Sequence, residues 1–164
     1  MSSEAELRLL ADLASIQALR KSSGDYSVSG CHASLFLEVE QLVPAVSLLF
    51  DRGYFLEDIA GIDVAEGILI VYHFDRFDAS GRVALRLTVP HSAKKAPSIA
   101  AIFSGADWHE RECFDFFGVE FENHPDLKPL LLPDDLGIHP LLKDKDRKSL
   151  FSMLPLRQMV DGKT

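Results

Sequence analysis

Residues 107–127, DWHERECFDFFGVEFENHPDL, divide this chain into two parts of different composition. The stretch begins with charged residues set among aromatic ones and ends in a proline-containing extension. Charges that close to bulky apolar groups are normally kept in water or held by partners, because burying a lone charge is costly. The residues before the stretch have the composition of a folded domain, and those after it have the composition of a tail.

The first part of this stretch is predicted to be a helix. Asp107 is a suitable N-cap, and Glu110 follows three residues later, as a capping box requires. Gly118 is placed to end the helix in the left-handed conformation. Arg111 and Asp115 are four residues apart and are expected to form an ion pair along one side.

Upstream, the hydrophobic periodicity predicts an α+β domain over residues 1–122. Helices are expected at 4–20 and 42–52, the second with Pro44 in its first turn and Gly53 after its end. Alternating apolar residues predict a small, mostly antiparallel sheet with helices packed on one face. Its strands are expected at 35–39, 54–62 with a break at Ala60-Gly61, 67–74 and 82–89, followed by an exposed loop at 91–97 and a short helical turn at 98–103.

Downstream, residues 123–164 read as an extended tail rich in proline and leucine. Each proline removes a backbone donor and disfavours a helix before it. His124-Pro125 and His139-Pro140 each place a histidine where it can fix a turn through a backbone hydrogen bond. So many leucines need a partner surface, either this domain or a groove on another protein, and the composition favours the groove. Five of the eight prolines lie here: Pro125, Pro129, Pro133, Pro140 and Pro155.

The totals exclude several classes of protein. A net charge of −8 argues against nucleic-acid binding, which needs clustered cations. No apolar run approaches the length of about 18–20 residues needed to span a membrane, and the N-terminus has no signal-peptide core. Only Cys31 and Cys113 are present, too few for a Cys-ligated iron–sulfur cluster in this chain. We therefore expect a soluble domain in a reducing, cytoplasmic setting that carries no cofactor or metal of its own.

A metal-dependent enzyme is the alternative that the helix suggests. His109 and Cys113 are four residues apart and can face one ion, with Glu110 between them as an acid or base. The helical metalloprotease motif needs histidine at the second position, and a third ligand would have to come from His124 or His139. A solvent-facing histidine with a packed thiol is the commoner outcome.

The same carboxylates are weak candidates for acid–base catalysis. Glu110 and Glu112 point to different sides of a helix, so capping and ion pairing are favoured over a catalytic role for Glu110, Glu112 and Asp115. No glycine-rich phosphate loop and no GxSxG nucleophile elbow is present in the sequence.

With these residues in view, the chain resembles the 30-kilodalton subunit of respiratory complex I, designated C. DWHERECFDFFGVEFENHPDLK and LLLPDDLGIHPLLKD match that family's long signature, and RGYFLEDIAGID with ILIVYHF resembles its upstream segments. The resemblance covers about residues 42–146. Matching positions are Trp108, Glu110, Arg111, Glu112, Asp115, Phe117, Gly118, Val119, Phe121, His124, Pro125, Asp126, Leu127, Lys128, Leu130, Leu131, His139, Pro140, Leu141, Lys143 and Asp144.

The resemblance implies an α+β scaffold subunit without a redox centre. Such subunits sit on the peripheral arm at the cytoplasmic side of the membrane, near iron–sulfur subunits, and pack on the quinone-pocket subunit, designated D. The parent complex is then expected to carry iron–sulfur clusters, quinone and FMN with NADH. Pro129 and Leu142 stand where the family has arginine, which fits a divergent branch such as membrane-bound hydrogenases or deazaflavin-dependent dehydrogenases. The docking residues implied are Trp108, Glu110, Arg111, Glu112, Asp115, Gly118, Phe121, His124, Pro125, Asp126, Leu127, Lys128, His139, Pro140, Leu141, Lys143 and Asp144.

Overall fold

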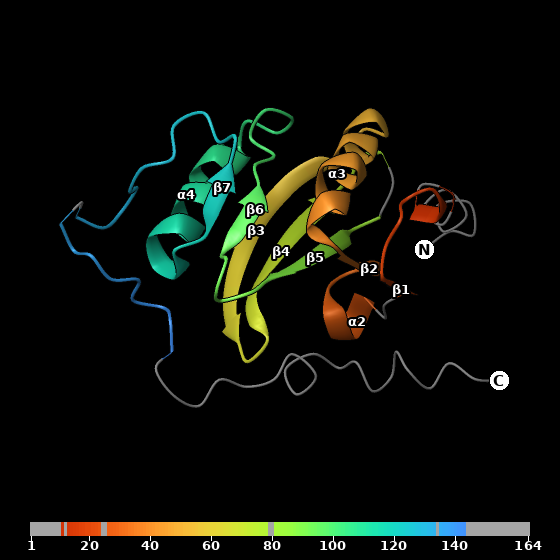
Figure 1. Ribbon diagram of the computed structural model, residues 1–164. Helices are drawn as coiled ribbons and strands as arrows, with labels where there is room; N and C mark the ends of the chain where they lie inside the picture. Colours follow the sequence, from red (N-terminus) through yellow and green to blue (C-terminus); the bar gives the residue numbers. More distant parts are fainter. Residues whose placement is uncertain (1–10, 12, 24–25, 79–80, 134, 144–164) are drawn as a thin grey trace.

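The computed structural model shows a five-stranded sheet packed against helices (Figure 1). The described residues that follow β7 (Glu120–Glu122) form a long irregular segment. The structure describes residues 11, 13–23, 26–78, 81–133 and 135–143. Its elements in chain order are β1 (Arg20–Ser23), α2 (Tyr26–Ser29), β2 (Ala33–Leu37), the 3₁₀ turn η1 (Val39–Gln41), α3 (Leu42–Asp51), β3 (Phe55–Val64), β4 (Gly67–Asp75), β5 (Val83–Val89), β6 (Lys95–Pro97), α4 (Ala106–Phe117) and β7 (Glu120–Glu122).

The main sheet has the strand order β1-β2-β5-β4-β3 and is mostly antiparallel, as predicted. The exception is the central pair β2–β5, which runs parallel from Ala33↔Val83 to Leu37↔Leu87. The chain reaches β3 from β2 through α3, and a crossover of this kind is what parallel strands require. The β3-β4-β5 meander then brings β5 beside β2.

The core lies between one face of this sheet and the helices α3 and α4. Val83, Leu85, Leu87 and Val89 alternate onto this face, as the sequence pattern predicts, and are 0–1% exposed. Helix α3 begins at Leu42 and is followed by Gly53 in the left-handed conformation, again as expected. The mixed α+β class is thus confirmed.

Strand β3 continues through Ala60 and Gly61, so the predicted break there is wrong. The reason is tertiary. A Cβ placed on Gly61 would come within 2.6 Å of the Phe117 ring, so this glycine allows α4 to approach the strand rather than interrupting it.

Two further predictions differ from the structure. Most of the helix expected at 4–20 lies outside the described residues. Its C-terminal end is wrong, because the helical residues Leu13 and Ala14 are followed by a turn and then by strand β1. The loop expected at 91–97 contains β6, which pairs in parallel with β7. Residues 98–103 form a turn closed by the Phe103 amide on the Ile99 carbonyl. No helix within the described residues is long and apolar enough to span a membrane.

Candidate partner-docking site

The predicted capping box at the start of α4 does not form. The helix begins two residues earlier than predicted, with Gly105 as N-cap and no side-chain cap, so Asp107 lies inside the first turn. Its predicted partner Glu110 is fully buried and turns toward a neighbouring loop instead. The capping rule considers only local sequence, whereas the tertiary neighbours of Glu110 offer stronger donors.

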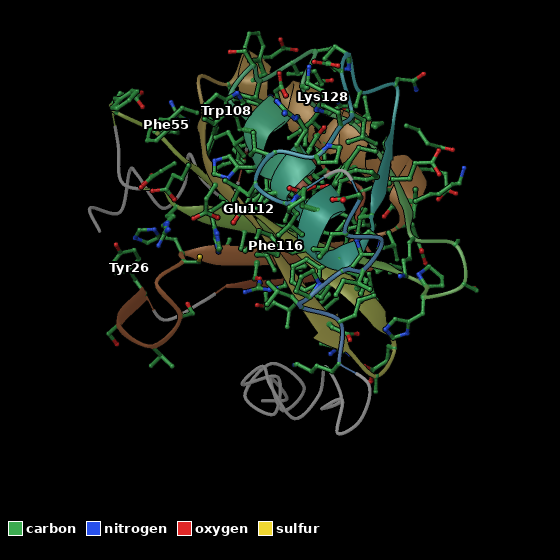
Figure 2. The ribbon with its side chains drawn as sticks, turned by 90° about the vertical axis from the view of Figure 1, so that its left-hand side faces the viewer. Tyr26, Phe55, Trp108, Glu112, Phe116 and Lys128 are labelled. Carbon is green, nitrogen blue, oxygen red and sulfur yellow. The ribbon has the colours of Figure 1, made fainter. Side chains whose placement is uncertain are left out.

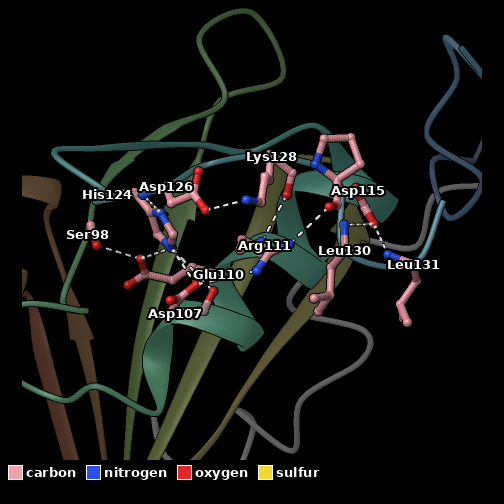
Figure 3. Close-up of polar contacts among 11 residues, drawn as sticks. Ser98, Asp107, Glu110, Arg111, Asp115, His124, Asp126, Lys128, Leu130 and Leu131 are labelled. Carbon is pink, nitrogen blue, oxygen red and sulfur yellow. Dashed lines mark hydrogen bonds and ion pairs between the residues drawn. The ribbon is translucent and has the colours of Figure 1, made fainter. Parts of the chain in front are cut away.

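Glu110 ties α4 to the turn that precedes it. Its carboxylate accepts a hydrogen bond from the Ser98 hydroxyl at 2.6 Å (Figure 3) and another from the Ile99 amide at 2.7 Å. Burial raises the pKa of Glu110 to about 7, and the nearby Asp107 adds to this, while the two hydrogen bonds act in the opposite direction. Glu110 is therefore an internal group of the domain and cannot itself contact a partner surface.

His124 closes the same cluster from the tail. Its side chain is fully buried, and its Nδ1 accepts a hydrogen bond from the Asp126 amide at 3.0 Å. The proton of the neutral ring is consequently on Nε2, which lies 3.2 Å from the Asp107 carbonyl and 3.8 Å from the Glu110 carboxylate. The expected role of His124 in fixing a turn by a backbone hydrogen bond is thus observed.

Arg111 holds tail backbone and does not pair with Asp115, contrary to the prediction. Its Nε and one terminal nitrogen each donate at 3.0 Å, to the carbonyls of Lys128 and Pro129. Its closest carboxylate is Asp107, at 3.9 Å on the preceding turn. The guanidinium thus donates hydrogen bonds to two backbone carbonyls of the tail. Proline prevents this segment from forming the regular backbone hydrogen bonds of a helix or strand.

Asp115 binds the next part of the tail. One carboxylate oxygen accepts three consecutive amide hydrogens. The amide nitrogens of Leu130 and Leu131 lie at 2.8 Å (Figure 3), and that of Leu132 lies at 3.2 Å. The residue is only 3% exposed. A carboxylate that accepts several amide hydrogens in a buried position is a strong, charge-assisted anchor.

The second His-Pro turn is fixed at the end of α4. His139 Nδ1 lies 2.8 Å from the Asp115 carbonyl, and the Leu141 amide donates to the Phe116 carbonyl at 3.2 Å. Gly118 ends the helix in the left-handed conformation, as predicted. A Cβ on Gly118 would come within 2.5 Å of the His139 ring, so the glycine also makes room for the tail.

A buried carboxylate that the sequence reasoning missed fixes the last described residue. The Asp63 side chain is fully buried and accepts the Lys143 amide and the His91 Nε2, both at 2.7 Å. The Lys143 ammonium also reaches the Asp63 carbonyl at 3.2 Å. One acidic residue at the end of an apolar strand was the only signal available in the sequence.

Up to Lys143 the tail therefore lies back over its own domain, the less favoured of the two predicted alternatives. Figure 1 shows this segment passing alongside α4. Phe121 is buried in β7, and Leu127 packs against the core. Pro125, Asp126, Lys128 and Pro140 are exposed. Asp144 lies outside the described residues.

What remains free on this side is an exposed, largely apolar surface. Figure 2 shows Trp108, Glu112 and Phe116 succeeding one another along the outer side of α4. Trp108 is 68% exposed, Glu112 is exposed and Phe116 is half-buried. The tail adds exposed apolar side chains at Leu131, Leu136, Ile138 and Leu141. We call these seven residues the outer surface, because exposed large apolar side chains of this kind are candidates for contact with another protein.

The metal-enzyme alternative gains little from this geometry. Cys113 packs in the main core, where burial raises the pKa of its thiol to about 12, whereas a metal ligand must be a thiolate. His109 is half-buried on the same helix. In the ranges that the structure describes, no three His, Cys, Asp or Glu side chains are grouped to hold a metal ion.

The fold and the site define a class of protein: an α+β domain whose charged helix binds its own tail and presents an apolar outer surface. The particular family follows from comparison with known sequences. Residues 35–149 match the family described as the respiratory-chain NADH dehydrogenase, 30 Kd subunit. This chain belongs to that family.

Individual relatives agree with this assignment. The chain is 36% identical to the NADH-quinone oxidoreductase subunit designated C of Roseiflexus sp. (strain RS-1), covering 68% of each protein. It is 38% identical to the F(420)H(2) dehydrogenase subunit of the same designation from Methanosarcina mazei, over 60% of this chain and 62% of that one.

Two solved structures share the fold. A chain of the archaeal membrane-bound sulfane sulfur reductase superposes with a TM-score of 0.75 at 19% identity, over 99% of this chain and 96% of that one. A trypsin-resistant fragment of Nqo5 superposes with a TM-score of 0.57 at 24% identity, over 75% of this chain and 99% of the fragment.

Proposed function

We propose that this chain is a non-redox scaffold subunit in the peripheral arm of a complex I–type oxidoreductase, and that it docks on the quinone-pocket subunit through the outer surface. A quinone reductase fed by NADH is the first candidate for the parent complex, because most of the similar sequences carry that name. A deazaflavin-linked complex is the alternative, because the Methanosarcina mazei relative is an F(420)H(2) dehydrogenase subunit. On this proposal the iron–sulfur clusters, FMN and quinone belong to the other subunits.

The observation that supports the proposal is that the residues of α4 have two different roles. Glu110, Arg111 and Asp115 form hydrogen bonds with this chain's own loop and tail. Trp108 on the same helix is left 68% exposed. A surface tryptophan beside a held apolar segment is a typical binding anchor, since aromatic anchors contribute most of the energy of an interface.

Loss of the anchor is expected to weaken assembly without affecting the fold. Trp108→Ala should lower the affinity for the quinone-pocket subunit by about 30-fold, the effect of a typical interface hot spot. Glu112→Ala should have a smaller effect, because an exposed ion pair at an interface rim contributes little. Copurification of co-expressed subunits, followed by titration of the purified chains, measures both.

Phe50→Ala provides the matched control, because Phe50 is an exposed aromatic on α3, at 53% exposure. It should leave the affinity unchanged. Equal copurification by Trp108→Ala and the wild-type chain would refute docking through this surface.

A further inference from the structure

The exposed apolar residues of the tail lie between two fixed points. At one end, the Asp115 carboxylate holds the amides of residues 130–132. At the other end, the Lys143 amide donates to the Asp63 carboxylate at 2.7 Å. Between these points, the described residues of the range 133–138 make no backbone hydrogen bond to the folded domain. The position of this exposed segment therefore depends on what holds its two ends.

Asp63 holds the far end of the segment by two contacts to one residue. Its side chain is fully buried near the end of β3, and its Oδ2 accepts the Lys143 amide. The Lys143 ammonium also reaches the Asp63 carbonyl at 3.2 Å. Because a buried carboxylate that loses its donors is strongly destabilised, this contact resists release of the tail.

His91 orients the same carboxylate from the loop that follows β5. Its side chain is 28% exposed, and its Nε2 lies 2.7 Å from Asp63 Oδ1. Because a carboxylate oxygen is an acceptor, Nε2 carries the hydrogen of this contact in either charge state of the ring. His91 thus binds one oxygen of Asp63, and the other oxygen is directed to Lys143.

Neither Asp63 nor His91 belongs to the outer surface, so an effect of either residue on partner binding has to pass through the tail. The apolar tail residues Leu136, Ile138 and Leu141 are 39–62% exposed, and the last of them lies two residues before Lys143. A segment that is ordered before it binds loses less conformational entropy on binding. Holding the end of the tail therefore raises the affinity of the residues that the tail presents.

We propose that Asp63 and His91 form a latch that orders the tail and thereby raises the affinity of the outer surface for the quinone-pocket subunit, without touching that subunit. The identity of the partner rests on the proposed function, whereas the latch itself rests on the contacts of Asp63 within this chain. Both are positioning residues, because they act through Lys143 and the segment before it.

Asp63→Asn tests the latch in the full-length chain. Asparagine keeps the size of the side chain but replaces one acceptor oxygen with a donor, so it cannot serve both His91 and Lys143. We expect the Leu141 amide to exchange about tenfold faster, and the affinity for the purified quinone-pocket subunit to fall about tenfold, since a hydrogen bond to a charged group contributes roughly that much. The amides of residues 130–132 should stay protected.

Asp75→Asn is the matched control. Asp75 ends β4 and likewise accepts backbone amides, those of Arg76 and Gly81, but it holds a different loop. This variant should leave the exchange of the tail and the affinity unchanged. His91→Ala should reproduce part of the effect, and His91→Gln, which keeps a donor, should restore wild-type behaviour. Because His91 is partly exposed, its variants carry the test even if Asp63→Asn unfolds.

Double variants distinguish ordering of the tail from a general loss of stability. Ile138→Ala combined with Asp63→Asn should weaken binding by less than the product of the two single effects, because both changes act through the tail. Trp108→Ala combined with Asp63→Asn should give the full product, because Trp108 is held by α4 and not by the tail. A general loss of stability would not distinguish the two pairs.

Wild-type affinity in Asp63→Asn would overturn the latch, as would independent effects of Asp63→Asn and Ile138→Ala. A loss of affinity in Trp108→Ala alone would overturn the latch and leave the proposed function standing. A loss of affinity in neither Trp108→Ala nor Asp63→Asn would count against the proposed function as well.

Discussion

Asp115→Ala is expected to release the tail from α4 while leaving the rest of the domain folded. One buried oxygen of this carboxylate accepts the amides of Leu130, Leu131 and Leu132. Hydrogen bonds to a charged group contribute about 1.5–3 kcal/mol each, and their loss leaves three amides to be solvated. We therefore expect the tail to lose roughly 3 kcal/mol of its binding to α4, after allowing for water that replaces part of the contact.

Hydrogen exchange measures this directly. A loss of that size should speed exchange of the three amides by about a hundredfold, because each 1.36 kcal/mol is a factor of ten. Asp126→Ala is the control, since Asp126 is exposed and pairs only with the neighbouring Lys128. Amides that stay protected in Asp115→Ala would show that the carboxylate does not hold the tail. If they are released, affinity for the quinone-pocket subunit should fall as well, because Leu131 belongs to the outer surface.

Glu110→Gln is expected to remove a pH dependence from the stability of the domain. The pKa of Glu110 is raised by burial to about 7, above the usual value of 4.5. The folded state therefore binds a proton more tightly than the unfolded state does. Its contribution is fully present below about pH 4.5 and is lost as the pH rises through about 7. Across this pH range the contribution of Glu110 to the free energy of unfolding changes by about 3 kcal/mol.

Thermal unfolding between pH 5 and pH 8.5 tests this expectation. The glutamine side chain can still accept from the Ile99 amide and meet the Ser98 hydroxyl, so the variant should be the more stable protein at the alkaline end. Asp107 and His124 face Glu110 in the same cluster and are unchanged in both proteins. An equal pH slope for Glu110→Gln and the wild-type chain would contradict the assignment.

Much of the fold followed from local rules. Strands β4 and β5 were predicted correctly, from the apolar run in β4 and the alternation of apolar and polar residues in β5. These patterns depend only on consecutive residues. Helix α3 and the glycine at the end of α4 were also correct, since these signals lie within one turn of the helix end. The break predicted at Gly61 was wrong because this glycine is required by a residue distant in sequence. It makes room for the ring of Phe117.

The candidate site shows the same limit more sharply. The long signature in residues 107–144 was sufficient to identify the family, and the match over residues 35–149 confirms it. The roles predicted for individual charged residues, by contrast, were partly wrong. Capping by Asp107 and pairing of Arg111 with Asp115 are inferences from spacing. The first failed because the helix begins at Ala106, which leaves Asp107 inside its first turn, and the second failed because both residues find partners in the tail.

The sequence by itself determined the strands β4 and β5 and helix α3, that the chain is acidic with too few cysteines for an iron–sulfur cluster, and that it belongs to this family. Those properties depend on composition and on neighbours within a few residues. Only the tertiary structure decided what the charges of α4 do. Glu110 turns inward to Ile99, Asp115 binds Leu130 to Leu132, and Asp63 receives Lys143 from the far end of the described tail. A buried carboxylate takes whichever amide donors folding brings to it, and no local spacing rule specifies partners that are distant in sequence.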